Sequence, residues 1–304
     1  MAYKDLIGNE KIKKLLEQTV KNDKVLHSYL FSGKDGIGKY LIAKEFAKSI
    51  LCQNDGEIPC NQCKSCLEFE SCNHPDYYLI EPDGNSIKID QIRYSNAKIL
   101  EKPVNSNKKV YIIRDSHKMT KEAQNSLLKT LEEPPEYAVI ILITSQEERL
   151  LTTIKSRCTK ISFEPLKDDE IVEYFKKQGE ILPETILKLA EGSISKALKL
   201  IPKQEVYDKM RMFISNIETI EKLEILKQEF IYQEKDDIQN ILDDMNSLLF
   251  QKVQENENKI AYIRAIELIE ETKEKLRSNS NFDMCIDNLL LNIWEEINEK
   301  YCRS

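Results

Sequence analysis

Short apolar runs alternate with amphipathic helical patterns over the first part of the chain. The apolar runs lie at residues 28–31, 77–81, 110–114 and 139–144. Helical patterns separate them, such as the apolar stripe within residues 12–20. Apolar strands that alternate with helices form a parallel sheet whose two faces are both covered. We therefore expect an α/β domain over residues 1–164.

The pattern changes after Pro165, where only helical periodicity continues. All eight glycines lie at or before Gly192 and the last proline is Pro202, so the rest of the chain contains neither of these helix-breaking residues. We expect a small domain of three helices over residues 165–203, opened by acidic residues in its first turn. An all-α bundle should follow over residues 204–304.

Two apolar stripes at helical spacing mark the long helices of this bundle. The first contains Ile238, Ile241, Leu242, Met245, Leu248 and Leu249, and the second contains Ile260, Ile263, Ile266 and Ile269. Isoleucine and leucine stripes are typical of helix packing rather than ligand binding. We therefore expect the surface of the bundle, more than any pocket, to carry its function.

Length and charge restrict the classes of function. A chain of 304 residues exceeds what one core usually supports, and a net charge of −7 argues against a protein that holds nucleic acid by bulk electrostatics. The first residues are charged, and no apolar run approaches the roughly 20 residues of a membrane span. We expect a soluble, cytoplasmic protein without membrane contact, whose role on DNA would be local or shared with partners.

Residues 33–40, Gly-Lys-Asp-Gly-Ile-Gly-Lys-Tyr, resemble a phosphate-binding loop. In such a loop glycines let backbone N–H groups point at phosphate, a lysine reaches the outer phosphates, and a Ser or Thr hydroxyl binds Mg²⁺. The candidate phosphate-binding residues are Gly33, Gly36, Gly38 and Lys39. Tyr40 occupies the position of the hydroxyl, so this loop can hold a nucleotide or sulfate through its backbone while lacking a part that ATP hydrolysis needs.

A second departure follows the apolar run at 110–114. In an ATPase of this layout the strand should end in two acids, the first aiding Mg²⁺ and the second orienting the attacking water. Here the two residues are Arg114 and Asp115, so a cation replaces the metal-side carboxylate. Together with Tyr40, this loss argues against ATP hydrolysis by the chain.

Four of the eight cysteines are spaced like metal ligands. The pattern C-x7-C-x2-C-x2-C is made by Cys52, Cys60, Cys63 and Cys66. In an intracellular chain such cysteines are more often thiols or metal ligands than disulfides. The spacing predicts a structural, tetrahedral Zn²⁺ site in an insert at about residues 52–74. Four unrelated reduced thiols are the alternative, and Cys72 and His74 are nearby residues that can replace a ligand.

The chain resembles the bacterial clamp-loader family over most of residues 1–202. The matching blocks are HSYLFSG at 27–33, the cysteine insert, IDQIR at 89–93, LLKTLEEPP at 127–135 and SRC at 156–158. The resemblance implies an AAA+ P-loop domain over 1–164, a helical lid over 165–203, and a helical collar over 204–304 through which subunits assemble.

In this family ATP binds at subunit interfaces and is touched by an SRC arginine of the next subunit. The resemblance therefore implies that Arg157 is an arginine finger acting in trans, since a planar, always-charged guanidinium suits charge developing on a phosphoryl group. The alternative is a surface arginine paired with a carboxylate such as Glu164. ATP-hydrolysing relatives carry a sensing arginine where this chain has Ser195, and Lys196 lies about 100° further round the helix. The implied role is a non-hydrolysing clamp-loader subunit, a non-catalytic component of the DNA polymerase holoenzyme.

The resemblance also implies partners in DNA replication: the motor subunits gamma and tau, the delta subunit, and, through the complex, the sliding clamp and primed DNA. Zn²⁺ is the expected cofactor, and turnover of ATP with Mg²⁺ is not expected. One alternative is an ATP-hydrolysing motor subunit of the gamma/tau type, which would require Asp115 to do the work of two acids. A second is a zinc-dependent nucleic-acid-binding module, which the few basic and aromatic residues of the cysteine insert disfavour.

Overall fold

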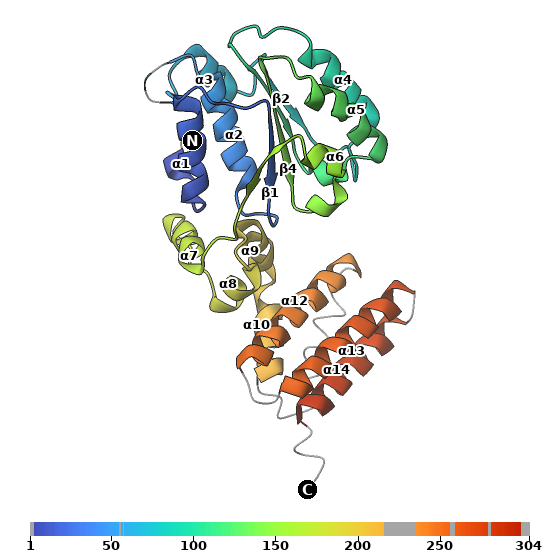
Figure 1. Cartoon of the computed structure of the whole chain (residues 1–304). Helices are drawn as coiled ribbons and strands as arrows, with labels where there is room; N and C mark the ends of the chain where they lie inside the picture. The colour runs from blue at the N-terminus through green and yellow to red at the C-terminus, as the bar shows by residue number, and fades with distance from the viewer. Residues whose placement is uncertain are drawn as a thin grey trace. The chain divides into compact units, whose positions relative to one another are not determined.

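The structure is a computed structural model that describes residues 3–54, 56, 58–215, 235–255, 259–278 and 281–298 (Figure 1). The chain forms two compact units, of which the first comprises Met1–Ile181 and Glu191–Ser195. The second comprises Leu182–Ala190 and Lys196–Ser304. All candidate residues for phosphate binding, metal binding and the finger belong to the first unit.

A five-stranded parallel sheet, in the order β2-β3-β4-β1-β5, forms the centre of the first unit. Its strands are β1 (Ser28–Ser32), β2 (Tyr77–Ile80), β3 (Lys109–Ile113), β4 (Ala138–Thr144) and β5 (Thr159–Ser162). The four strands expected from apolar runs are confirmed. β5 has no apolar run because, of its residues, only Ile161 is buried.

Helices cover both faces of the sheet, as the alternating pattern predicts (Figure 1). On one face lie α1 (Glu10–Lys21), α2 (Lys39–Leu51) and α3 (Lys64–Glu70), and on the other lie α4 (Ile89–Ile99), α5 (Lys121–Glu132) and α6 (Thr152–Lys155). Phe31 and Phe46 belong to the first core, and Tyr111 and Leu127 to the second. Burial on both faces stabilises the sheet by about 25 cal/mol per Å² of apolar surface. It thereby holds the carboxyl ends of the strands, where sites of α/β proteins lie.

Helix α7 (Asp168–Lys177) completes the helices of the first unit. The acids of its first turn lie at the positive end of the helix dipole, as expected, and the Glu170 carboxylate accepts the backbone N–H of Lys167 at 2.9 Å. The next helix, α8 (Glu184–Ala190), belongs to the second unit. Because the units divide the predicted 165–203 segment, a separate lid domain stays a prediction.

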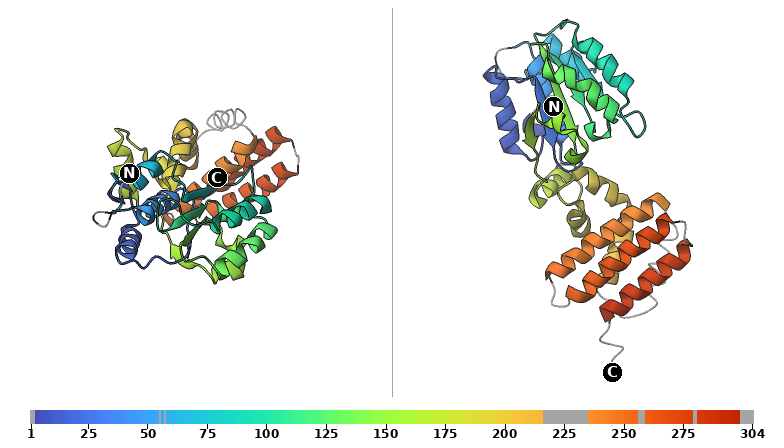
Figure 2. Two further views of the ribbon diagram at one scale, coloured as in Figure 1. Left: turned by 90° about the horizontal axis from the view of Figure 1, so that it is seen from above. Right: turned by 45° about the vertical axis from the view of Figure 1, so that its right-hand side comes forward.

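The second unit consists of helices over its described residues. After α8 come α9 (Ile194–Leu200), which begins in the first unit, a short 3₁₀ turn (Ile201–Lys203), α10 (Gln204–Ser215), α12 (Lys235–Glu255), α13 (Lys259–Arg277) and α14 (Phe282–Asn298). Figure 2 shows α12, α13 and α14 packed side by side. Residues 216–234, 256–258, 279–280 and 299–304 of the predicted collar lie outside the described residues. Among the described helices, none is long and apolar enough to cross a membrane.

The first predicted apolar stripe is confirmed, whereas the second is wrong at Ile260 and Ile263 and correct at Ile269. All six residues of the first stripe are buried on α12. On α13, however, Ile260 and Ile263 are 68% and 45% exposed, while Ala261, Ala265 and Ile269 are buried. A strict three-residue repeat drifts about 60° round a helix at each step, so Ile260 and Ile263 lie off the packing face to which Ile269 belongs.

Candidate functional site

The predicted phosphate-binding loop connects β1 to α2 at the carboxyl edge of the sheet. The Gly33 N–H donates to the Thr144 carbonyl at 3.3 Å, which attaches the loop to the end of β4. Gly36 and Gly38 have φ angles of 73° and 90°, a region that favours glycine, and α2 begins directly after Gly38. The glycines therefore shape the cradle that the sequence predicts.

The lysine of this loop is bound by the loop itself. Lys39 Nζ donates to the carbonyl of Gly33 at 2.6 Å and to that of Lys34, and it lies 3.8 Å from the Asp35 carboxylate. The side chain is only 6% exposed, and burial lowers the pKa of Lys39. The ammonium that would reach the outer phosphates thus already has acceptors within its own loop.

A second segment covers the loop. A Cβ atom at Gly36 would lie 2.2 Å from Ser193 Oγ and 2.6 Å from Ser195 Cβ, so the backbone here is in close contact with residues 191–195. An ion pair of 2.9 Å between Lys34 and Glu191 joins the same two segments. Ser195, predicted to replace a sensing arginine, therefore does lie at the loop but brings no charge to it.

Lys196 is directed elsewhere, as its position on the helix predicts. Its ammonium lies 2.9 Å from the carboxylate of Asp244 on α12, within the second unit. Asp244 is buried and also accepts the hydroxyl of Tyr207 at 2.8 Å. Lys196 therefore pairs with the helical bundle in place of a phosphate.

Arg114, which the sequence predicts to take the place of the metal-side carboxylate, contacts Tyr40 directly. Its guanidinium lies 4.9 Å from the centre of the Tyr40 ring and pairs with Glu81 at 2.8 Å. The two residues predicted to replace the hydroxyl and the carboxylate of an ATPase thus form a cation–π contact with each other. Asp115 precedes a short 3₁₀ helix (Ser116–Lys118) and pairs with Lys118 at 3.2 Å.

Two further polar residues of this edge were not indicated by the sequence pattern. Thr144, at the end of β4, places its hydroxyl 3.3 Å from Nδ1 of His117. Both residues are buried, and burial lowers the pKa of His117. The position of Thr144 at the end of the strand beside β1 is the signal that would have identified it, because ligands of parallel sheets bind at these ends.

Arg157 lies at the surface between α6 and β5. Its Nη1 donates to the carbonyl of Thr153 at 2.9 Å, and its Nη2 pairs with the Glu132 carboxylate at 2.6 Å. The side chain is 33% exposed. The ion-pair partner is therefore Glu132, the last residue of α5, in place of the suggested Glu164.

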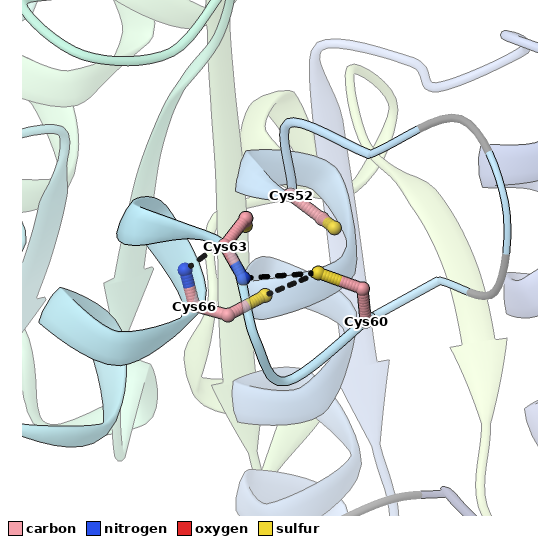
Figure 3. Close-up of side chains that lie close together, drawn as sticks. All are labelled: Cys52, Cys60, Cys63 and Cys66. Atoms are coloured by element: carbon pink, nitrogen blue, oxygen red, sulfur yellow. Dashed lines mark hydrogen bonds between the residues drawn. The ribbon is translucent and has the colours of Figure 1, made fainter.

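The four predicted cysteine ligands come together in one cluster (Figure 3). All four sulfur atoms lie within 4.8 Å of one another, and those of Cys60 and Cys66 are 3.9 Å apart. A tetrahedral site with Zn–S bonds of about 2.3 Å needs sulfur–sulfur separations of about 3.8 Å. The cluster therefore has the size and the donor set of a metal site.

Backbone N–H groups support sulfur in its ionised form. The N–H of Cys63 points at the sulfur of Cys60 at 3.3 Å, and that of Cys66 points at the sulfur of Cys63 at 3.4 Å. Desolvation opposes ionisation of Cys60, yet hydrogen bonds from the Gln62 and Cys63 backbone lower its pKa to about 6. The backbone at the N-terminus of α3, where Cys63 is the cap, thus favours a thiolate at Cys60, whereas burial raises the pKa of Cys52 and of Cys66.

His74 is not available as a substitute ligand. Its Nδ1 accepts the backbone N–H of Asp76 at 3.0 Å, and its Nε2 lies 2.8 Å from the buried hydroxyl of Ser65. Cys72 is exposed and is not part of the cluster. The candidate ligand set is therefore the four predicted cysteines.

The insert is joined to the rest of the first unit through buried polar contacts. Just after the insert, the Asp76 carboxylate is fully buried and accepts the backbone N–H groups of Val104, Asn105 and Ser106 at 2.7, 2.8 and 2.9 Å. The Asn105 side chain of this segment donates to the Glu68 carboxylate of the insert at 2.6 Å. Lys48 of α2, 1% exposed, pairs with Glu70 at the end of α3. These contacts anchor the insert on the sheet side independently of the cysteines.

Comparison with known proteins adds three findings. A family model described as DNA polymerase III, delta subunit, matches residues 8–167. The delta' subunit of DNA polymerase III from Bacillus subtilis is 38% identical over 72% of this chain and 65% of that protein. The tau subunit from the same organism is 36% identical over 63% of this chain and 34% of that protein. The chain therefore spans less than two thirds of the length of these relatives.

A solved structure shares the fold. The gamma subunit-related protein of DNA polymerase III from Thermotoga maritima superimposes with a TM-score of 0.51, covering 95% of this chain and 99% of that one. The identity is 20%, so this likeness concerns the fold alone. It agrees with a unit built on a parallel sheet that is followed by helices.

Proposed function

Because the chain belongs to the clamp-loader family of bacterial DNA polymerase III subunits, we propose that it is the delta-prime subunit, which takes part in loading the sliding clamp without hydrolysing ATP. Its proposed partners are the gamma or tau motor subunits and the delta subunit, and through them the sliding clamp and primed DNA in the bacterial cytoplasm. The isolated chain is then not an enzyme but a non-catalytic component of the polymerase holoenzyme.

The closed phosphate loop is the observation that carries this proposal. In an active loop the lysine ammonium binds the outer phosphates, whereas Lys39 donates to the carbonyls of Gly33 and Lys34. The Arg114 guanidinium lies 4.9 Å from the centre of the Tyr40 ring, and these two residues stand at the sequence positions where an ATPase has a carboxylate and a hydroxyl for Mg²⁺. Nucleotide binding would require displacing both sets of contacts, and hydrolysis would still lack its metal ligands.

The active contribution of this subunit, in our proposal, is Arg157. It is partly exposed on the first unit, and a guanidinium can bind phosphoryl oxygens through two parallel N–H groups. Presented to the ATP of a neighbouring motor subunit, Arg157 would stabilise the charge that develops as the phosphoryl group is transferred.

We propose Zn²⁺ as the metal of the cysteine cluster. Four thiolates from Cys52, Cys60, Cys63 and Cys66 would hold the ion and would complete its four-coordinate set without an open position. The role of the metal is therefore structural: it holds the insert, whereas the ATP chemistry belongs to neighbouring subunits.

Reconstitution tests the proposal. The chain would be combined with motor and delta subunits, sliding clamp, primed DNA and ATP, and clamp loading would be measured with and without it. We expect loading to depend on the chain, while the chain alone turns over no ATP. The alternative is a motor subunit, and the observation in its support is the 36% identity to tau. Mg²⁺-dependent ATP hydrolysis by the isolated chain would establish that alternative.

A further inference from the structure

Among the described residues, the Arg157 guanidinium has one hydrogen-bond partner from a distant part of the sequence. This partner is Glu132. The pair joins the end of α5 to the segment between α6 and β5, with Nη2 and Oε1 2.6 Å apart. The other acceptors of the guanidinium, the Thr153 carbonyl at 2.9 Å and the Ser156 hydroxyl at 3.5 Å, belong to its own segment. Glu132 therefore decides which way one terminal nitrogen points.

The position of Glu132 is unfavourable for the helix that carries it. As the last residue of α5, its carboxylate lies at the negative end of the helix dipole, where cations are preferred. The Arg157 guanidinium compensates this carboxylate. Helix stability alone therefore does not account for a glutamate here, whereas its ion pair with Arg157 does.

We propose that Glu132 is a positioning residue that occupies the phosphoryl-binding nitrogen of Arg157 in the free subunit and exchanges it for the neighbour's ATP. This inference rests on the proposed finger role of Arg157. A carboxylate and a phosphoryl group offer the same kind of anionic oxygen to a guanidinium, so they compete for Nη2. Nη1, which the Thr153 carbonyl holds, remains in place during the exchange.

The exchange should cost little because the pair is exposed. The side chains of Arg157 and Glu132 are 33% and 49% exposed. Exposed ion pairs shift equilibria by at most about fivefold. Glu132 therefore keeps the Arg157 guanidinium in one orientation without preventing its use. Removing the charge of Glu132 should strengthen the binding of Arg157 to the neighbour's ATP by a factor of about two to five.

Glu132→Gln tests the proposal, because the amide keeps the shape of the side chain and removes its charge. Glu133→Gln is the matched control, since this adjacent glutamate is also exposed and changes the net charge equally. Both would be titrated into a reconstituted loader whose only functional ATP site is the one facing Arg157. The half-saturating concentration of the subunit and the maximal ATPase rate would be read separately.

We expect Glu132→Gln to lower the half-saturating concentration about two- to fivefold with an unchanged maximal rate. Glu132→Asp keeps the charge, so its half-saturating concentration should be closer to that of the unmodified protein. The effect should vanish when Arg157→Ala is combined with it, and Glu133→Gln should leave the concentration unchanged. Equal half-saturating concentrations for Glu132→Gln and Glu133→Gln would overturn the proposed role of Glu132. An effect of Glu132→Gln that persists in the Arg157→Ala background would also overturn it. Neither result would bear on the proposed finger role of Arg157. If Arg157→Ala by itself changes nothing, the finger and this inference both fail.

Discussion

Replacing Arg157 with alanine separates its proposed catalytic role from its structural one. In the free subunit the guanidinium makes a hydrogen bond of 2.9 Å to Thr153 and an ion pair of 2.6 Å to Glu132, with its side chain 33% exposed. Exposed pairs of this kind contribute about 0.2–1 kcal/mol to stability. We expect Arg157→Ala to lower the free energy of unfolding by no more than about 1 kcal/mol.

The expected loss of activity is much larger. An arginine finger can contribute on the order of 10³–10⁵ in rate at its own site, equivalent to about 4–7 kcal/mol of barrier. In free energy, the expected loss in catalysis is therefore several times larger than the expected loss in folding stability. Arg157→Ala should fold and assemble nearly normally while hydrolysis at that single interface falls by orders of magnitude.

The assay must isolate the interface, because other subunits supply their own arginines. In a loader whose remaining ATP sites are inactivated, ATP hydrolysis stimulated by primed DNA and clamp loading would be measured together. Arg157→Lys should recover only part of the activity, since it keeps the charge but loses the bidentate geometry. Glu147→Gln, which breaks the 2.7 Å ion pair with Lys160 on the same unit, is the control and should stay fully active. Unchanged hydrolysis in Arg157→Ala would refute the finger and leave the subunit an architectural role.

Three other predictions follow from the site and the core. The isolated chain should hydrolyse no ATP above background, and Tyr40→Thr should not restore turnover because Arg114 still occupies the metal side; measurable Mg²⁺-dependent turnover by this variant would contradict the proposal. Fresh protein should contain one zinc ion per chain by metal analysis, and Cys63→Ser should release it and unfold the insert locally while the sheet persists; absence of zinc together with four freely reactive thiols would disprove the site. Burial of Glu45, which is 4% exposed, raises its pKa from 4.5 to about 7. The stability gained from its protonated form is thus complete below pH 4.5 and is lost as the pH rises through 7. Glu45→Gln should remove this pH dependence and raise the free energy of unfolding at pH 8 by up to about 3 kcal/mol, as measured by urea unfolding at pH 5 and 8; an unchanged slope would show that Glu45 is not its source.

Features with a local signal were predictable. The apolar runs that became β1 to β4 are continuous because both faces of a parallel sheet are buried. The glycines of the loop adopt the conformations that their type permits. Three members of the cysteine cluster also follow from short spacing, since C-x2-C steps at the start of a helix bring the sulfur atoms of Cys60, Cys63 and Cys66 together, whereas Cys52 joins them from the end of α2, which contacts α3.

Predictions failed where the signal was not local. The isoleucines of α13 have a helical repeat, but the face that α13 buries against its neighbouring helices contains Ala261, Ala265 and Ile269 and excludes Ile260 and Ile263. β5 has no apolar run because its residues, apart from Ile161, are exposed. Thr144 and His117 look ordinary in the sequence and become neighbours only because β4 ends beside the loop after β3.

The residues of the loop, the insert and the strand ends are enough to predict a four-cysteine site and an α/β P-loop scaffold that lacks its metal ligands, because each prediction depends on groups only a few positions apart. Three-dimensional packing was needed to learn that Lys39 is bound by its own loop, that residues 191–195 lie against Gly36, and that Arg157 meets Glu132. The last two contacts join segments that are far apart in the chain. Their partners are selected by the order of the strands and the faces on which the helices pack, which no spacing along the sequence specifies.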